Sequence, residues 1–282
     1  GEKVVMRVLD QSKGLVSLDK MGFDPHTITL WKKAYSSGNG IVLVTGPTGS
    51  GKSTTLYATL TRINTVEEHI ITIEDPVERQ LEGIIQGHVN ERAGMTFAAA
   101  LRSMLRQDPD VIMVGEMRDR ETADLAIRAA LTGHLVFSTL HTNSAAASYT
   151  RLADMGCDPF LLTTTIRAIL AQRLIRKLCD RCKVKYRPTE KDLKSIGLKQ
   201  LDGFIYHSNP KGCKTCGKDG YKGRAGLYEL LIPNEAINEA VKNEASAEEV
   251  SRIARDNKMR MLEDAARTYV TQGLTSIEEI NR

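Results

Sequence analysis

The segment Gly46-Pro-Thr-Gly-Ser-Gly-Lys-Ser53 constrains the fold of this chain more than any other, because it matches the phosphate-binding pattern G-x-x-x-x-G-K-[ST]. It lies directly after a run of β-branched residues (41–45) and directly before a helix-like stretch (53–63), which is the context that the pattern requires. In such a loop the glycines let backbone N–H groups converge on a phosphate, and the positive end of the following helix adds to the attraction. A glycine-rich turn with a chance lysine is the alternative, and the correct flanks argue against it.

We therefore predict a nucleoside triphosphate site in this loop. Lys52 is expected at the β- and γ-phosphates, and the Ser53 hydroxyl is expected to bind Mg²⁺. The residues expected around the phosphates are Gly46, Pro47, Thr48, Gly49, Ser50, Gly51, Lys52, Ser53 and Thr54.

Short apolar runs alternate with amphipathic stretches along the first half of the chain. The predicted strands are Ile41–Thr45, Ile70–Ile73, Val111–Val114 and Leu135–Thr139. The predicted helices are Ile28–Tyr35, Ser53–Ile63, Thr96–Arg106 and Arg120–Leu131. Buried strands that alternate with helices indicate an α/β fold with a parallel sheet covered on both faces. After Pro233 the chain is predicted to be helical, with capping boxes that begin at Ser246 and Thr275.

Composition excludes two classes of protein. With 41% hydrophobic residues and a net charge of +4, the chain has enough apolar residues for a core and is not intrinsically disordered. Its longest uncharged run, 129–150, contains glycine, histidine, asparagine and several hydroxyl residues, so that run is not a membrane-spanning segment.

Two glutamates follow predicted strands at the edge where a parallel sheet holds its ligand. Glu116 comes two residues after the run Val111–Val114, and Glu74 directly follows Ile70–Ile73. Hydrolysis needs a carboxylate within reach of a water that is in line with the γ-phosphate. Either glutamate could serve, and the alternative is that both are ordinary loop acids at strand ends.

Two arginines and two histidines are weaker candidates from spacing alone. Arg102 and Arg106 lie four residues apart on one predicted helix, and the repulsion between them is tolerable if an anion bridges them. A solvated basic face is the alternative for that pair. His134 and His141 flank the last predicted strand, and each could equally be a satisfied structural histidine.

The second half of the chain contains a basic, cysteine-rich module. Between residues 173 and 224 there are 15 basic and 5 acidic residues, whereas the rest of the chain is mildly acidic. The pairs Cys179/Cys182 and Cys213/Cys216 each have C-x-x-C spacing, which predicts a closed, structural Zn²⁺ site with four thiolate ligands. A redox pair and four unliganded thiols are the alternatives, and Cys157 is predicted to be a small apolar filler.

These motifs together resemble the ATPases of bacterial type II secretion and type IV pilus assembly over nearly the whole chain. Residues 46–54 resemble the family's Walker A motif, 73–78 its Asp box, 108–119 its Walker B motif and 132–143 its His box. Residues 171–179 and 212–231 resemble the entry to and exit from its metal-binding subdomain. The related pilus-retraction ATPases lack the four cysteines, so the resemblance is to the secretion or pilus-extension branch.

The resemblance implies a fold and a set of partners. The fold is a RecA-like P-loop core with an inserted zinc-binding subdomain and a helical C-terminal subdomain. The activity is hydrolysis of ATP with Mg²⁺ by a homo-hexamer that acts on an inner-membrane platform protein from the cytoplasmic side. Further modules upstream would dock adaptor proteins. Arg7, Arg102 and Arg106 are similar to the arginines that reach the phosphates, Arg118 is a weaker candidate, and His141 is similar to the nucleotide-sensing histidine.

We divide the chain on this basis into four parts. They are a remnant of an upstream domain with a linker (1–24), the ATPase core (25–172), the tetracysteine module (173–224) and the helical part (225–282). The rival function is a nucleic-acid motor, since RecA-like cores also drive helicases and the basic module could bind phosphates. That module has few aromatic residues for base stacking, so no nucleic-acid partner is expected.

Overall fold

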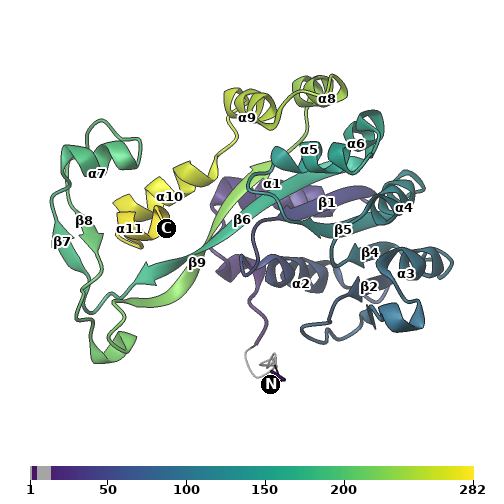
Figure 1. The fold of residues 1–282 in the computed structure, drawn as a ribbon, viewed down its shortest axis with the longest axis horizontal. Coiled ribbons are helices and arrows are strands. Elements are labelled where there is room, and N and C mark those ends of the chain that lie inside the picture. The colour runs from purple at the N-terminus through teal and green to yellow at the C-terminus, as the bar shows by residue number, and fades with distance from the viewer. Residues whose placement is uncertain (1, 5–13) are drawn as a thin grey trace.

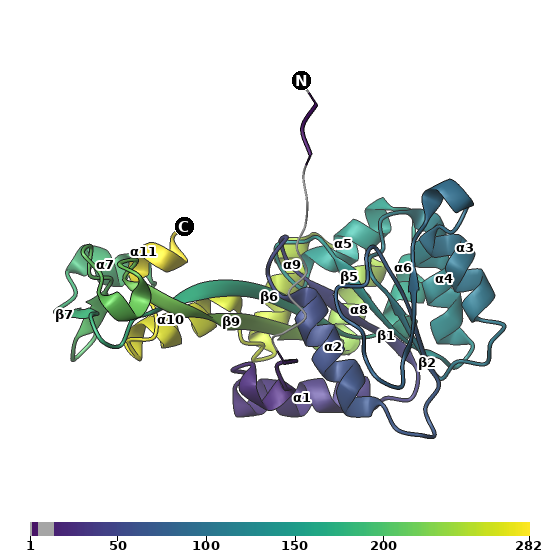
Figure 2. The same cartoon turned by 90° about the horizontal axis from the view of Figure 1, so that it is seen from below.

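A computed structural model describes residues 2–4 and 14–282. A layered α/β core forms one end of the molecule and the tetracysteine module forms the other, with two long strands joining them (Figures 1 and 2). Arg7 lies outside the described residues, as do the other masked positions of the predicted upstream remnant and linker (1–24).

A seven-stranded sheet forms the centre of the core, in the order β3-β2-β4-β5-β1-β6-β9. All neighbours are parallel except β6 and β9, which are antiparallel. The predicted α/β fold with a parallel sheet is therefore confirmed. The strands are β1 (Gly40–Thr45), β2 (Ile70–Glu74), β3 (Ile85–His88), β4 (Val111–Val114), β5 (Leu135–Leu140), β6 (Ile166–Leu178) and β9 (Tyr221–Leu231).

Helices cover both faces of this sheet, and β1 shows why its sequence is continuously apolar. Ile41 and Leu43 belong to a buried cluster on one face, and Val42 and Val44 belong to a cluster on the other. The first face is covered by α3 (Phe97–Met104), α4 (Arg120–Leu131), α5 (Ala147–Asp154), α6 (Pro159–Thr165), α8 (Glu235–Lys242) and α9 (Ala247–Asp256). The second is covered by α1 (Pro25–Tyr35) and α2 (Lys52–Ile63).

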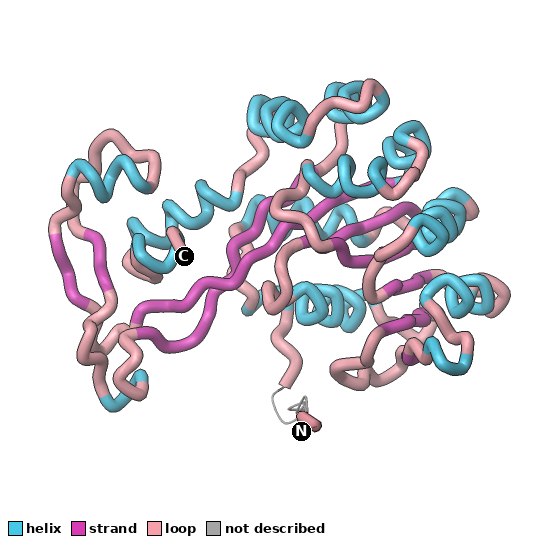
Figure 3. The backbone as a smooth tube through the Cα atoms, viewed as in Figure 1, coloured by secondary structure: helices cyan, strands magenta, loops and turns pink. Residues whose placement is uncertain are grey.

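Strands β6 and β9 form a long ribbon that the sequence patterns do not predict. They are 13 and 11 residues long, and they pair from Ile169↔Leu231 to Leu178↔Tyr221 (Figure 3). The core half of β6 is buried, whereas its outer half is partly exposed and carries arginine and lysine, so the run is neither purely apolar nor cleanly alternating. The predicted domain boundaries at 172/173 and 224/225 both fall inside these strands.

The tetracysteine module contains a second, two-stranded sheet, β7 (Val184–Tyr186) and β8 (Ile205–His207), and the helix α7 (Glu190–Ser195). The helix α10 (Leu262–Thr271) joins this module to the ribbon, since Ala265 and Ala266 pack on the ribbon and Val270 packs on the module. The last helix, α11 (Ile277–Ile280), packs beside it.

The structure tests the two helix caps that were predicted at Ser246 and Thr275. Ser246 caps α9, with its Oγ accepting from the Glu249 N–H at 3.2 Å, which is one of the two hydrogen bonds of the predicted capping box. The cap predicted at Thr275 is wrong by one residue, because Ser276 accepts from the Glu279 N–H at 3.3 Å. Thr275 instead donates to the Arg176 carbonyl at 2.9 Å, which anchors the start of α11 to the ribbon. In the part of the chain that the structure describes, no helix has the length and apolar character needed to cross a bilayer.

Candidate functional site

The P-loop, residues 46–54, connects the carboxyl end of β1 to the first turn of α2. Gly46, Gly49 and Gly51 have φ angles of 145°, 78° and 90°, which are conformations that residues with a Cβ rarely adopt. At Gly46 a Cβ would lie 2.3 Å from the Gln172 carbonyl oxygen, so a side chain there would clash with backbone. The loop therefore needs its glycines, and it presents the N-terminus of a 12-residue helix to a ligand.

Lys52 and the hydroxyl residues after it lie at this helix N-terminus. The Lys52 Nζ donates to the carbonyls of Gly46 at 2.8 Å and of Pro47 at 3.3 Å. Burial lowers the pKa of Lys52, and the negative charges of Glu116 and Glu78 oppose that shift. Ser53 and Thr54 are half-buried on the first turn. A lysine that is bonded to the loop and faces carboxylates is suited to a polyphosphate and to a cation beside it.

Glu116 lies at the same edge of the sheet, two residues after β4. Its Oε2 accepts from the Arg118 Nε at 2.7 Å, and its Oε1 lies 3.3 Å from the His141 Nε2. The side chain is 20% exposed, so a water molecule can reach it. His141 follows the carboxyl end of β5, and Arg118 also lies 3.6 Å from an oxygen of Asp75. The structure thus brings Glu116, His141, Arg118 and the P-loop lysine together.

Glu74 has a different environment, although it also ends a strand. Its side chain is buried and accepts hydrogen bonds from the hydroxyl of Tyr57, from the Thr72 Oγ1 at 2.7 Å and from the Gln86 Nε2 at 3.1 Å. Burial and the Glu74 carboxylate raise the pKa of Tyr57, which keeps this phenol protonated and able to donate. Both carboxylate oxygens are therefore already engaged with protein donors.

Tyr57 and Gln86 are residues that the sequence analysis missed. Tyr57 also accepts from the backbone N–H of Glu78 at 3.2 Å, so it links α2 to the segment after β2. No spacing pattern identifies such a partner, because the bond joins residues of separate elements that only the folded sheet brings together.

The two predicted arginines of the α3 region are not at the P-loop of their own chain. Arg102 forms an exposed ion pair with Glu121 on α4. Arg106 is exposed and lies beyond the end of α3, which stops at Met104 rather than at the predicted residue 106. Within residues 2–4 and 14–282, no hydrogen bond or ion pair joins either arginine to residues 46–54.

His134 lies at the opposite edge of the sheet from His141. It precedes β5, and its Nδ1 lies 2.9 Å from the Ala129 carbonyl and 3.1 Å from the Thr132 Oγ1. These contacts close the turn between α4 and β5. His134 is therefore a structural histidine, which was one of the two interpretations of its sequence position.

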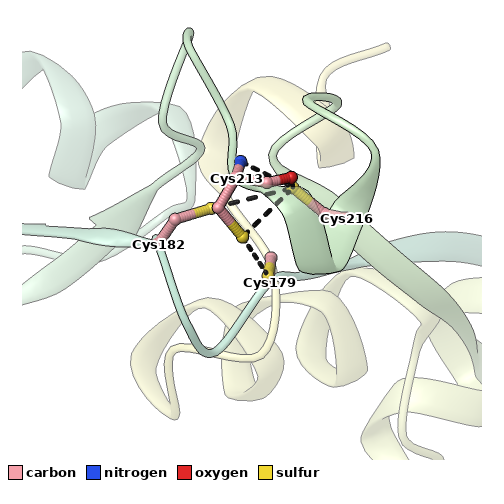
Figure 4. A group of neighbouring side chains, drawn as sticks. All are labelled: Cys179, Cys182, Cys213 and Cys216. Atoms are coloured by element: carbon pink, nitrogen blue, oxygen red, sulfur yellow. Dashed lines mark hydrogen bonds between the residues drawn. The ribbon is translucent and has the colours of Figure 1, made fainter.

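The four cysteines converge at the far end of the ribbon (Figure 4). Cys179 directly follows β6, and Cys213 and Cys216 precede β9, so the cluster ties the two strand ends together. The Sγ atoms of Cys179 and Cys213, of Cys182 and Cys216, and of Cys213 and Cys216 are each 3.8 Å apart. A tetrahedral ion with metal–sulfur bonds of about 2.3 Å requires sulfur–sulfur separations of about 3.8 Å. The cluster therefore fits a tetrahedral metal ion.

Backbone N–H groups stabilise the thiolate form of one cysteine of this cluster, Cys216. The Cys216 Sγ accepts from the N–H groups of Cys213 at 3.2 Å and of Gly220 at 3.3 Å. The hydrogen bond from Cys213 is the largest cause that lowers the pKa of Cys216, to about 6. The fifth cysteine, Cys157, is buried in the apolar core, which raises its pKa to about 11 and agrees with its predicted role as a filler.

We predict that the purified protein contains about one zinc ion per chain, because four thiolates leave no open position and favour Zn²⁺. Cys216→Ser removes one ligand and should lower the zinc content, measured by elemental analysis, to background. Cys157→Ala is the matched control and should keep its zinc. A folded parent protein without metal would contradict the assignment.

Comparisons with known proteins agree with this geometry. The family of type II/IV secretion system proteins matches residues 1–282. The type II secretion system protein E of Pseudomonas aeruginosa is 48% identical over 282 residues, which cover all of this chain and 56% of that protein. The type IV pilus assembly ATPase PilB of Thermus thermophilus is 46% identical over 99% of this chain and 32% of its own length.

A solved structure with a similar fold is the pilus retraction motor PilT with bound ADP. It aligns with a TM-score of 0.70 and 32% identity over 96% of this chain and 67% of that one. The chain spans 56% of the length of the Pseudomonas aeruginosa protein and 32% of the length of the Thermus thermophilus protein. The whole-length family match and the identities of 46–48% lead to one conclusion: this chain belongs to the type II/IV secretion system protein family and has the P-loop ATPase core of that family.

Proposed function

We propose that this chain is the ATP-hydrolysing part of a motor that powers type II protein secretion or type IV pilus assembly. The observation that carries the proposal is the position of Glu116, a water-accessible carboxylate two residues beyond β4, at the same edge of the sheet as the P-loop. Family membership supports the same reading, since the relatives include a type II secretion protein and a pilus assembly ATPase.

Each part of the site has a proposed role. The P-loop amides and Lys52 hold the phosphates of ATP, and the Ser53 hydroxyl, on the first turn of α2, would hold a Mg²⁺ ion that neutralises charge on them. Glu116 orients the attacking water and accepts its proton. His141, 3.3 Å from Glu116, can pass a change at the terminal phosphate on to the loop after β5. Glu74 instead has the role of a structural acceptor in this proposal.

Assembly and location complete the proposal. The motor is a homo-hexamer on the cytoplasmic face of the inner membrane, where it acts on a platform protein of the secretion or pilus system. Adaptor proteins would dock through modules outside this chain. Arg102, Arg106 and Arg7 would reach the phosphates of a neighbouring copy, because Arg102 and Arg106 make no contact with the P-loop of their own chain among the described residues.

Lys52→Ala should weaken MgATP binding by about 10- to 100-fold, because it removes a charge-assisted contact to the phosphates. Isothermal titration calorimetry of folded protein measures the change. Lys33→Ala is the control, since Lys33 is exposed on α1. Equal affinities of the parent and Lys52→Ala would exclude the proposed phosphate site.

Glu116→Gln should slow phosphate release by about 100- to 10,000-fold and leave nucleotide affinity nearly unchanged, because the amide cannot accept the proton of water. Glu74→Gln is the contrasting variant. It should lower the free energy of unfolding by about 1–3 kcal/mol, because an amide cannot accept all three hydrogen bonds, while the folded fraction still turns over. The opposite pattern, with turnover lost only in Glu74→Gln, would make Glu74 the base.

Mixing two inactive variants tests the arginines. Lys52→Ala keeps both arginines, and the double variant Arg102→Ala/Arg106→Ala keeps an intact P-loop. If the arginines act on a neighbouring copy, a mixture in assembled rings should hydrolyse ATP faster than either variant alone. Light scattering checks that the mixture is assembled. If the assembled mixture hydrolyses ATP no faster than either variant alone, these arginines do not contact the phosphates of a neighbouring copy.

A further inference from the structure

Strand β6 extends beyond the strand beside it at the P-loop. The parallel pairing of β1 with β6 ends at Thr45↔Ala171, where β1 turns into the P-loop. The next residue of β6, Gln172, has no β1 residue beside it, and its side chain is only 1% exposed. Its Nε2 donates to the Ser50 carbonyl at 2.7 Å, and its Oε1 accepts from the Thr55 Oγ1 at 2.6 Å. The amide therefore spans the P-loop and α2.

The glycines at both ends of the loop allow this close approach. A Cβ at Gly46 would lie 2.3 Å from the Gln172 carbonyl oxygen, and a Cβ at Gly51 would lie 2.8 Å from its Nε2. Leu174, on the same side of β6, would also contact a Cβ at Gly51, at 3.5 Å. Two glycines of the motif thus pack directly on β6, which makes Gln172 part of the support of the loop.

The hydrogen bond to the Ser50 carbonyl also determines the direction of the next N–H group, which can donate to a phosphate. In a trans peptide the C=O and the N–H point to opposite sides of the chain. The Ser50 carbonyl is held by Gln172, so the N–H of Gly51, in the same peptide, points the other way. We propose that Gln172 is a positioning residue that fixes the orientation of the Ser50–Gly51 peptide, so that the Gly51 N–H faces the phosphates. This inference rests on the proposed ATP site.

A structural role alone predicts a different outcome. If Gln172 only stabilised the fold, its loss would lower the melting temperature, as the loss of another buried side-chain hydrogen bond does, and would leave the affinity of the folded protein for MgADP unchanged. Thr165 provides that comparison, because its buried Oγ1 donates to the Leu161 carbonyl at 2.7 Å, next to the amino end of β6 and away from the loop.

The first experiment measures MgADP affinity and melting temperature for Gln172→Met and Thr165→Val beside the parent. Methionine keeps the length of the side chain and removes both hydrogen bonds. We expect Gln172→Met to bind MgADP about tenfold or more weakly, the effect of losing one or two buried hydrogen bonds, while Thr165→Val binds as the parent does. Equal affinities of Gln172→Met and Thr165→Val would overturn the inference.

The second experiment uses the conservative variant Gln172→Glu, in which lowering the pH should restore the affinity for MgADP. A protonated carboxyl can donate to the Ser50 carbonyl and accept from Thr55, as the amide does, whereas a carboxylate cannot donate. Burial raises the pKa of a carboxyl group, so the substituted carboxyl should gain its proton as the pH falls from about 8.5 to about 6. The affinity of Gln172→Glu for MgADP should therefore approach that of the parent at the lower pH and fall below it at the higher pH.

The affinity of Gln172→Glu for MgADP is divided by the affinity of the parent at the same pH. This ratio removes the effect of other ionisable groups at or near the site, which are Lys52, Glu116, Glu78 and His141. A ratio that does not change with pH in folded protein would contradict the positioning role, even if Gln172→Met failed to fold. Failure of the inference differs from failure of the proposed function. In the first case the parent binds MgADP and Lys52→Ala binds it more weakly, while both Gln172 variants bind as the parent does. In the second, the parent does not bind nucleotide, and both proposals are wrong.

Discussion

The position of β1 between two parallel neighbours is the constraint on which the rest of the site depends. Gly40–Thr45 pairs with Leu135–Leu140 on one side, and Ile41–Thr45 pairs with Ile166–Ala171 on the other, with one register shift between Ile41 and Val42. Parallel strands end at one edge, and that edge therefore collects the P-loop, Glu116, His141 and Gln172 from separate parts of the chain. Each side chain keeps its place because the buried strand before it cannot slip without exposing apolar residues.

The two strand-end glutamates show how environment separates groups of the same chemical type. Glu74 is enclosed by Tyr57, Thr72 and Gln86, and such a carboxylate is a structural acceptor whose lone pairs are already used. Glu116 contacts Arg118 through Oε2 and His141 through Oε1, and its side chain remains 20% exposed. The partial exposure of Glu116 lets a water molecule reach its carboxylate, whereas the buried carboxylate of Glu74 is closed to water.

The core and its phosphate loop could be predicted because their signals are local. Glycine spacing, apolar strands such as Val111–Val114 and the cysteine pairs can each be recognised within about ten residues of sequence. The ribbon of β6 and β9 could not, because its outer half mixes charged and apolar residues and is stabilised by a partner strand more than forty residues away. The same reason hides Tyr57 and Gln172, whose bonds join distant elements. The end of α3 was placed two residues late, because Arg106 continues the helical spacing after the helix has stopped.

The ribbon also has a mechanical consequence. It extends beyond β1 at Gln172, beside the P-loop, and continues to Leu178 with one register shift between Arg176 and Leu178. At about 3.3 Å per residue, the part beyond Gln172 forms a lever about 20 Å long. By simple geometry, tilting its base by about 5° moves the tip by about 2 Å. A metal ion that clamps the tips of both strands would prevent them from fraying, so that the displacement is transmitted to whatever the tip touches instead of being lost as local unfolding.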